Sequence, residues 1–306
     1  MSLAVQFDEY GDLEVLQVRE VARPTPGAGE VLVRVRAAGI NPGENLIRGG
    51  GLHETWPASF PSGEGSDLAG VIEEIGPNVS TWAVGAEVIG WVDTRASHAE
   101  LVVVPAEHLV HRDPAVSWEM GGALFVAGAT AHATVRAIAA GPGDTVVVSG
   151  AAGGVGSLAV QLARRAGATV IGLASAANHD WLTGHGIIPV TYGDGVADRI
   201  RAVAPGGVDA FIDTFGSGYV DLALELGVAP DRINTIIDWE AAARTGVKVE
   251  GSMAASTAEV LGELAKLVAA GELEVPIAAT FPLTEVRAAY RELMQRHTRG
   301  KIVLLP

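Results

Sequence analysis

The segment from Asp144 to Gly156 constrains the fold of this chain more than any other part of it. It reads DTVVVSGAAGGVG, an apolar run that leads directly into a turn containing four glycines. Apolar residues then recur at helical spacing from Val155 onward, and Gly167 precedes a second apolar run that begins at Thr169. A strand, a glycine turn, a helix and a second strand in this order predict the start of a parallel α/β sheet.

The same segment predicts a dinucleotide site. Glycine lets the backbone approach a pyrophosphate closely, and the N-terminus of the following helix presents unpaired amides and the positive end of the helix dipole. Against the usual G-x-G-x-x-G pattern, Ala151 holds the first glycine position, whereas Gly153 and Gly156 fill the other two. A lone match often marks an ordinary turn, but the strand and helix context favours dinucleotide binding. We expect contacts at Ala152, Gly153, Gly154 and Val155.

The kind of dinucleotide depends on the charge at the end of the second strand. Sites that select NAD place Asp or Glu about 20 residues after the glycine turn, where the carboxylate binds the ribose and repels a 2′-phosphate. Here Ala174 and Ser175 hold that position, and no acidic residue occurs from Thr145 to His179. No Lys or Arg stands at the strand end either. We therefore expect NADP(H), bound through Ser175, Asn178 and His179, although these residues would also suit a simple polar turn.

The central part of the chain predicts a doubly wound sheet. From about Trp118 onward, apolar strand patterns are separated by helical patterns. The strand patterns are Asp144–Ser149, Thr169–Leu173, Asp209–Asp213 and Ile233–Ile237. Such alternation is typical of an α/β fold with a parallel sheet and helices on both faces.

The two ends of the chain predict a second, β-rich domain. Val31–Arg36 alternates apolar and polar residues, and short apolar runs follow at 70–75, 87–91 and 101–104. The C-terminal part shows a helix at 258–270, a strand at 273–281, a helix at 285–295 and a strand at 301–305. A terminal strand needs a sheet to pair with. We therefore expect domain segments 1–118, 119–270 and 271–306, with the last segment returning to the first domain.

The chain is acidic and contains no cysteine. Its 21 Lys and Arg against 36 Asp and Glu give a net charge of −15, which disfavours nucleic acid and anionic membranes as partners. The lack of cysteine excludes disulfides, thiol nucleophiles and thiolate zinc sites. The first ten residues lack the basic and apolar regions of a signal peptide, so we expect a cytoplasmic location.

Several short motifs occur in an order that resembles a known family. They are Ala37–Pro42, Gly65–Val71, Gly128–Ala131, Gly150–Gly156 and the ending Arg299–Leu304. Over essentially its whole length, the chain resembles the zinc-free quinone oxidoreductase branch of the medium-chain dehydrogenase/reductase superfamily. The resemblance implies a GroES-like substrate domain built from both chain ends and a central Rossmann domain. It also implies a homodimer paired through Rossmann sheet edges, for which Gly246–Glu250 is suitable.

The resemblance argues against catalytic zinc. Zinc-dependent members of the superfamily use a cysteine and a Gly-His-Glu segment, whereas this chain has Gly63–Asp67, without His, at the corresponding place. Without a Lewis acid, hydride transfer favours acceptors that spread the developing negative charge over a conjugated system. We therefore expect NADPH-dependent reduction of a quinone or an α,β-unsaturated carbonyl compound. A thioester enoyl reductase and a non-catalytic, crystallin-like nucleotide-binding protein are the alternatives.

Two residues are expected to be catalytic. Asn41 resembles the family asparagine that faces the nicotinamide, and its amide would orient the acceptor carbonyl; the alternative is a turn-forming residue before Pro42. His53 takes the place of a family tyrosine and would donate a hydrogen bond or proton, unless it is a solvated loop residue. The resemblance further places Thr130 near the nicotinamide and Tyr192 near the adenosine phosphate. From their position after a strand, Phe215 and Gly216 are expected to line the nicotinamide pocket.

Overall fold

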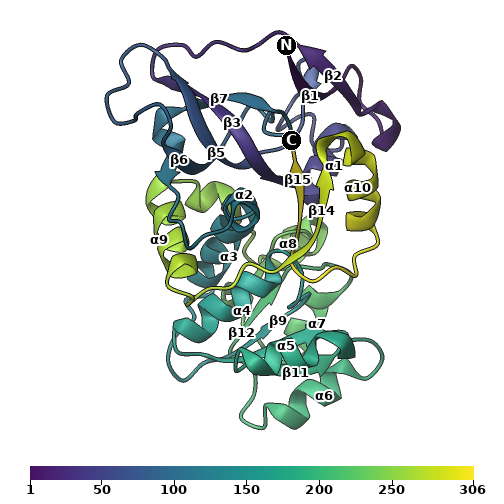
Figure 1. The fold of residues 1–306 in the computed structure, drawn as a ribbon. Coiled ribbons are helices and arrows are strands. Elements are labelled where there is room, and N and C mark those ends of the chain that lie inside the picture. Colours follow the sequence, from purple (N-terminus) through teal and green to yellow (C-terminus); the bar gives the residue numbers. More distant parts are fainter. The chain divides into compact units, whose positions relative to one another are not determined.

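The chain folds into two compact units. The structure is a computed structural model that describes residues 1–306 (Figure 1). Met1–Val126 and Thr257–Pro306 form one unit, here called the terminal unit, and Ala127–Ser256 forms the other, the central unit. Each unit has its own sheets and its own buried apolar residues.

A five-stranded parallel sheet forms the centre of the central unit, and helices flank it (Figure 1). Its strands are β9 (Thr145–Val148), β10 (Thr169–Ala174), β11 (Ile188–Thr191), β12 (Ala210–Asp213) and β13 (Ile233–Thr235). The helices are α3 (Phe125–Ala137), α4 (Gly156–Arg165), α5 (His179–Gly184), α6 (Val196–Val203), α7 (Tyr219–Glu225) and α8 (Trp239–Thr245).

The strand order explains where this sheet can bind a ligand. The order is β11-β10-β9-β12-β13, so the chain winds away from β9 in one direction and then crosses back to β12 on its other side. Strand β9 is apolar and fully buried from Val146 to Val148, as expected for a parallel sheet covered on both faces. Loops that leave the carboxyl ends of strands at such a reversal are the usual ligand site of this fold. The predicted doubly wound α/β sheet is confirmed.

The terminal unit is β-rich. A seven-stranded sheet has the order β14-β15-β3-β5-β6-β8, with β7 also paired to β3, and a three-stranded sheet has the order β2-β1-β4. The strands are β1 (Ser2–Phe7), β2 (Gln17–Val21), β3 (Glu30–Gly39), β4 (Ser62–Gly63), β5 (Asp67–Ile75), β6 (Glu87–Trp91), β7 (Leu101–Pro105), β8 (Leu109–His111), β14 (Ile277–Pro282) and β15 (Lys301–Leu305). Its helices are α1 (Pro42–Arg48), α2 (Trp118–Gly122), α9 (Ala258–Ala269) and α10 (Val286–Met294).

The two ends of the chain meet in this sheet. Strand β15, yellow in Figure 1, pairs antiparallel with the purple strand β3, where Val303 lies opposite Gly39 and Leu304 opposite Ala38. The predicted GroES-like, β-rich domain is confirmed. No helix of the chain combines the length and the apolar character that crossing a membrane requires.

The limits of the compact units differ from the expected domain segments. The units change after Val126 and after Ser256, whereas the expected boundaries follow residues 118 and 270. The reason is that two helices contact strands of the terminal unit: α2 lies on β3 and β5, and α9 lies on β8.

One expected strand is shorter in the structure, and the segment suited to pairing between subunits has a contact within its own chain. Strand β14 begins at Ile277 rather than at Leu273, because Pro276 has no backbone N–H for a ladder and its carbonyl accepts from the backbone N–H of Lys301 at 2.8 Å. Segment Gly246–Glu250 forms only an isolated bridge, in which Lys248 lies beside Asn234 of β13. This segment therefore lies along the edge of β13 within its own chain.

Candidate functional site

The glycine turn after β9 has the tight geometry that a phosphate-binding turn needs. A Cβ atom at Gly156 would lie 2.1 Å from the carbonyl oxygen of Gly150, and Gly150 itself has φ of +59°. A side chain at Gly156 would therefore collide with backbone that cannot move aside. A Cβ at Gly153 would lie 3.2 Å from the same oxygen, so that position is less crowded from within the protein.

The alanine that departs from the glycine pattern points into the core. Ala151 is fully buried, and its N–H donates to the carbonyl of Leu173 on β10 at 3.1 Å. Its methyl group occupies the space beside Gly172, where an added Cβ would come within 2.9 Å of it. The methyl group thus packs between strand and turn, so the departure from the usual pattern is taken up inside the core.

The N-terminus of α4 is open to an anion. Helix α4 begins at Gly156, its N-cap is Val155, and no side chain caps its first amides. No acidic residue lies in its first turn. The N–H groups of Ser157 and Leu158 donate to the carbonyls of Gly153 and Val155 at 2.9 and 3.1 Å. The amides that could meet a diphosphate are therefore those of the turn just before them, at the positive end of the helix dipole. Ala152, Gly153, Gly154 and Val155 all lie in this turn, so the structure brings the expected phosphate contacts together.

A buried carboxylate, which the sequence did not single out, organises the neighbouring turn. Asp213 Oδ1 accepts from the hydroxyl of Ser149 at 2.6 Å and from the N–H groups of Phe215 and Gly216 at 3.0 and 2.9 Å. Its Oδ2 accepts from Thr235 at 2.8 Å. One carboxylate therefore ties the carboxyl ends of β9, β12 and β13 together. Since the two N–H groups face Asp213, hydrogen bonds from this turn to a nicotinamide would use its carbonyl oxygens.

The residues expected at the adenosine end lie at the carboxyl ends of β10 and β11. Ala174 and Thr191 are partners in the register of these two strands. Asn178 donates to the hydroxyl of Ser175 at 3.1 Å, and the ring Nε2 of His179 lies 3.4 Å from the hydroxyl of Thr191. Tyr192 follows β11 and is 44% exposed. The structure therefore places Ser175, Asn178, His179 and Tyr192 on one polar surface.

An arginine adjoins this surface that the sequence analysis did not include. Arg199 of α6 donates from Nε to the carbonyl of Thr191 at 2.9 Å and from Nη1 to that of Asp194 at 2.7 Å. Nη2 donates to the carbonyls of Tyr192 and Gly193 at 3.3 and 3.1 Å. The search for a cation near the end of β10 could not find Arg199, because the residue comes from the helix that follows the next strand.

Thr130 lies in the middle of α3. Its side chain is buried, and so is that of Thr134 one turn later, which donates to the carbonyl of Ala131 at 2.9 Å. Helix α3 thus carries two buried hydroxyl groups within one turn of each other. The expected contact between Thr130 and the nicotinamide stays a prediction.

In the terminal unit, Asn41 is held on all sides by its own chain. Its Nδ2 donates to Glu44 and to Asp67, each at 3.1 Å, and its Oδ1 accepts a short hydrogen bond from the ammonium of Lys301. The residue is 6% exposed and forms the N-cap of α1. Both amide hydrogens are therefore used within the protein, and the remaining capacity toward a ligand is one lone pair of Oδ1. The expected donation to an acceptor carbonyl would require one of the two carboxylate bonds to break.

The network around Asn41 extends through the interior of the terminal unit. Glu44 accepts from the hydroxyl of Tyr290 at 2.5 Å. Arg48 forms a buried ion pair with Glu64, and its guanidinium lies 4.9 Å from the centre of the Tyr290 ring. These contacts join α1, α10 and the segment before β5. None of the three charged groups stood out in the sequence, because Glu64 and Tyr290, the partners of Arg48 and Glu44 of α1, lie far from them along the chain.

Burial controls the acid–base behaviour of this network. Burial raises the pKa of Glu64 to about 8, against the opposing positive charge of Arg48. Burial likewise raises the pKa of Asp67 above its ordinary value. The ammonium of Lys301, 3.6 Å away, opposes this rise without cancelling it. The pKa of the Tyr290 hydroxyl is raised by burial and by the negative charge of Glu44. Ionisation of the Glu64 and Asp67 carboxyl groups is therefore favoured by Arg48 and Lys301 and disfavoured by burial.

His53 lies in an exposed turn after α1. Its Nδ1 lies 2.8 Å from the carbonyl of Gly50, and its ring meets the ring of Tyr10 edge to face with centroids 6.5 Å apart. A carbonyl accepts only from a protonated nitrogen, so this contact assigns the hydrogen of the neutral ring to Nδ1. Neutral His53 can therefore accept through Nε2, and it can donate from that atom only as the imidazolium.

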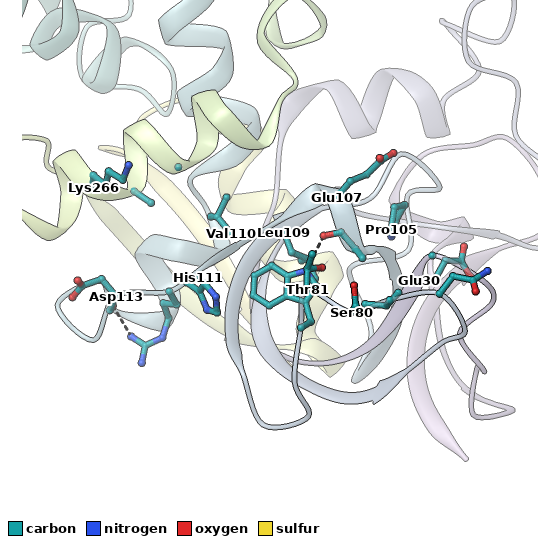
Figure 2. Close-up of a pocket in the computed structure, with 18 of the residues that line it drawn as sticks. Glu30, Ser80, Thr81, Pro105, Glu107, Leu109, Val110, His111, Asp113 and Lys266 are labelled. Atoms are coloured by element: carbon teal, nitrogen blue, oxygen red, sulfur yellow. Dashed lines mark hydrogen bonds between the residues drawn. The ribbon is translucent and has the colours of Figure 1, made fainter.

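A large groove lies elsewhere in the terminal unit. It is an open groove of about 1180 Å³ lined by residues of the 78–82 loop, by β8 and by α9. Figure 2 shows Thr81, Leu109, Val110, His111 and Lys266 around it. None of the expected site residues lines this groove. No group of three or more His, Cys, Asp or Glu side chains is arranged to hold a metal ion.

Comparison with known proteins points to one family. Residues 27–115 match the alcohol dehydrogenase GroES-like domain, and residues 187–304 match the family described as zinc-binding dehydrogenase. A quinone oxidoreductase of Pseudomonas aeruginosa is 32% identical over 330 aligned residues, covering 100% of both chains. A 2-haloacrylate reductase of Burkholderia sp is 30% identical, covering 100% of this chain and 99% of its own. The Escherichia coli quinone oxidoreductase complexed with NADPH has a TM-score of 0.87 at 25% identity, covering 99% of this chain and 100% of that one.

Proposed function

Because the chain belongs to the zinc-independent quinone oxidoreductase branch of the medium-chain dehydrogenase/reductase superfamily, we propose that it transfers hydride from NADPH to a quinone or an α,β-unsaturated carbonyl compound without zinc. The uncapped N-terminus of α4, behind the glycine turn, is the observation that carries this proposal. It offers amide donors to a diphosphate, which is the part that all nicotinamide dinucleotides share.

The residues of the central unit fit a nicotinamide cofactor. The turn 152–155 binds the diphosphate, and Ser175, Asn178 and Tyr192 bind the adenosine end with its 2′-phosphate. Asp213 fixes the turn that contains Phe215 and Gly216, and Thr130 contacts the nicotinamide from α3. The bound reduced cofactor supplies the hydride, and the protein supplies position and a fixed polar environment.

The choice of acceptor follows from the chain's own chemistry. The chain has no cysteine, so it lacks the thiolate ligands that zinc-dependent members of the superfamily use. Hydride addition leaves negative charge on the acceptor, and a conjugated acceptor spreads that charge without a Lewis acid. The names of two relatives, quinone oxidoreductase and 2-haloacrylate reductase, both denote conjugated acceptors, which supports this substrate class.

Two residues of the terminal unit act on the acceptor in this proposal. Asn41 presents Oδ1, which already accepts from the Lys301 ammonium, as an acceptor for the O–H group that the substrate gains on reduction, because the oxidised quinone or enone has no N–H or O–H to donate. His53, as the imidazolium, donates the proton that follows the hydride. Neither the thioester enoyl reductase nor the non-catalytic alternative is favoured by a specific contact. The expected homodimer would use the outer edge of Gly246–Glu250, and the cytoplasm is the expected location.

A crossed assay tests the proposal. NADPH and NADH oxidation would be followed with 1,4-benzoquinone, methyl vinyl ketone, 2-chloroacrylate and cyclohexanone, each with and without EDTA. We expect NADPH to support faster turnover of the conjugated acceptors than of cyclohexanone, with no effect of EDTA. Faster turnover with NADH would overturn the cofactor assignment. A loss of activity in EDTA that zinc restores would overturn the zinc-free mechanism, and equal rates with cyclohexanone would overturn the substrate class.

A further inference from the structure

We propose that Arg199 recognises the 2′-phosphate of NADP(H) and so decides between NADPH and NADH. The inference rests on the proposed function, because it presumes that the central unit binds a nicotinamide dinucleotide. It supplies the cation that the sequence around the end of β10 lacks.

Arg199 lies beside the polar surface already described. Strands β10 and β11 are neighbours in the sheet, with Ala174 opposite Thr191, so the segments that follow them leave the sheet side by side. The guanidinium donates to the carbonyl of Thr191, and the hydroxyl of the same Thr191 lies 3.4 Å from Nε2 of His179. Thr191 therefore links Arg199 to the segment Ser175–His179, where the 2′-phosphate is expected.

The guanidinium is fixed in place and still has capacity to bind. It makes four hydrogen bonds, all to the carbonyl oxygens of residues 191–194. A guanidinium has five N–H groups, so one N–H on Nη1 remains for a ligand. An arginine held in this way loses little further side-chain entropy when an anion binds.

Its charge is not neutralised by a contacting carboxylate. Arg201, on the same helix, forms ion pairs with Asp198 and Glu225, whereas the partners of Arg199 are all neutral carbonyl groups. Carbonyl oxygens stabilise a guanidinium without cancelling its net charge. A phosphate dianion that binds here would therefore interact with the full positive charge of the Arg199 guanidinium.

The surrounding charges make this cation necessary for phosphate binding. Asp180 and Asp194 are exposed in the same two segments, after β10 and after β11. Without Arg199, the fixed charges of this surface would be negative and would repel a 2′-phosphate, as the acidic residue of NAD-selective sites does. Arg199 thus acts on the 2′-phosphate, which only NADP(H) carries, rather than on the diphosphate that both dinucleotides share.

Binding of the nucleotide fragments tests the inference without turnover. Calorimetry would measure 2′,5′-ADP and 5′-AMP, and fluorescence would measure NADPH and NADH, for the wild type, Arg199→Gln and Arg199→Lys. Glutamine keeps an amide donor for the 191–194 carbonyls but removes the charge, whereas lysine keeps the charge. Arg201→Gln, on the same helix and already paired, is the matched control.

We expect Arg199→Gln to weaken the binding of 2′,5′-ADP and NADPH by roughly tenfold, as for loss of a charge-assisted hydrogen bond. The affinities for 5′-AMP and NADH should change less than twofold. Arg199→Lys retains most of the preference, and Arg201→Gln behaves as the wild type. If Arg199→Gln weakens both members of each pair equally, Arg199 only shapes the turn and the inference fails while the proposed function stands. If the wild type binds neither NADPH nor NADH, the proposed function fails as well.

Discussion

Asp67 accepts a hydrogen bond of 3.1 Å from the side-chain amide of Asn41, a residue 26 positions earlier in the chain. Asp67 is fully buried at the start of β5, and Lys301 of β15 lies 3.6 Å from the same carboxylate. Three elements that are distant in sequence thereby fix one side chain. The same amide that the sequence marked as catalytic is thus part of the internal support of the terminal unit.

Replacement of Asp67 by Asn should destabilise the protein. The change leaves the ammonium of Lys301 buried without a charged partner, and breaking one side of a buried pair costs about 3–5 kcal/mol. Urea unfolding measures the effect. Asp93→Asn, at a side chain that is 78% exposed, is the control and should stay within about 0.5 kcal/mol of the wild type. Equal stability of the two variants would show that the Asp67 contacts contribute nothing.

Replacement of Asn41 by Ala should affect turnover more than cofactor binding. The proposed role of Oδ1 predicts at least a tenfold lower kcat with the NADPH Kd changed less than twofold. Loss of its buried hydrogen bonds to Glu44, Asp67 and Lys301 should also cost about 1–3 kcal/mol of unfolding free energy. Steady-state kinetics and NADPH fluorescence titration separate these effects. Unchanged kcat would remove Asn41 from the catalytic residues and leave it a structural one.

Two glycines of the turn after β9 should respond differently to alanine. Gly156→Ala places a Cβ 2.1 Å from a backbone oxygen and should lower the thermal midpoint by several degrees. Gly153→Ala meets less crowding within the protein but puts a methyl group where the diphosphate approaches. It should therefore weaken NADPH binding more than tenfold while lowering the midpoint less than Gly156→Ala does. Gly206→Ala, with open space around it, is the control. Normal NADPH binding by Gly153→Ala would contradict the assigned turn.

The raised pKa of Glu64 predicts a dependence of stability on pH. With a pKa of about 8, Glu64 would keep its proton in the folded protein and contact Arg48 as a neutral carboxyl group up to about pH 8, whereas the unfolded chain loses the proton near the ordinary value of 4.5. The contribution of Glu64 is therefore full below about pH 4.5 and falls as pH rises toward 8, at about 1.4 kcal/mol per pH unit. Glu64→Gln removes this slope, so its stability relative to the wild type should rise from pH 5 to pH 8.

Urea titrations at four pH values between 5 and 8 measure this difference. Exposed Glu259→Gln serves as the matched control, and its stability should follow the wild type at every pH. Parallel curves for the wild type and Glu64→Gln would mean that Glu64 is ionised in the folded protein throughout, held so by Arg48.

The sequence was most informative where chemistry is local. The glycine turn, the apolar strand before it and the helix after it are contiguous, so steric and helix-dipole arguments predicted the turn and α4 closely. It was less informative at Leu273, where an apolar run resembled a strand, but Pro276 delays pairing until Ile277. A run of apolar residues reports burial, whereas pairing depends on which backbone groups have partners.

By itself, the sequence determined the α/β fold, the family and the position of the glycine turn, because periodicity and glycine spacing are properties of neighbouring residues. Only the tertiary structure decided the partners of the charged groups. Lys301 reaches Asn41 across 260 positions, Arg199 reaches the loop after β11 from the next helix, and Asp213 joins three strand ends. Electrostatic interactions act over a few ångströms in space without regard to sequence distance, so these groups become recognisable only when the chain has folded.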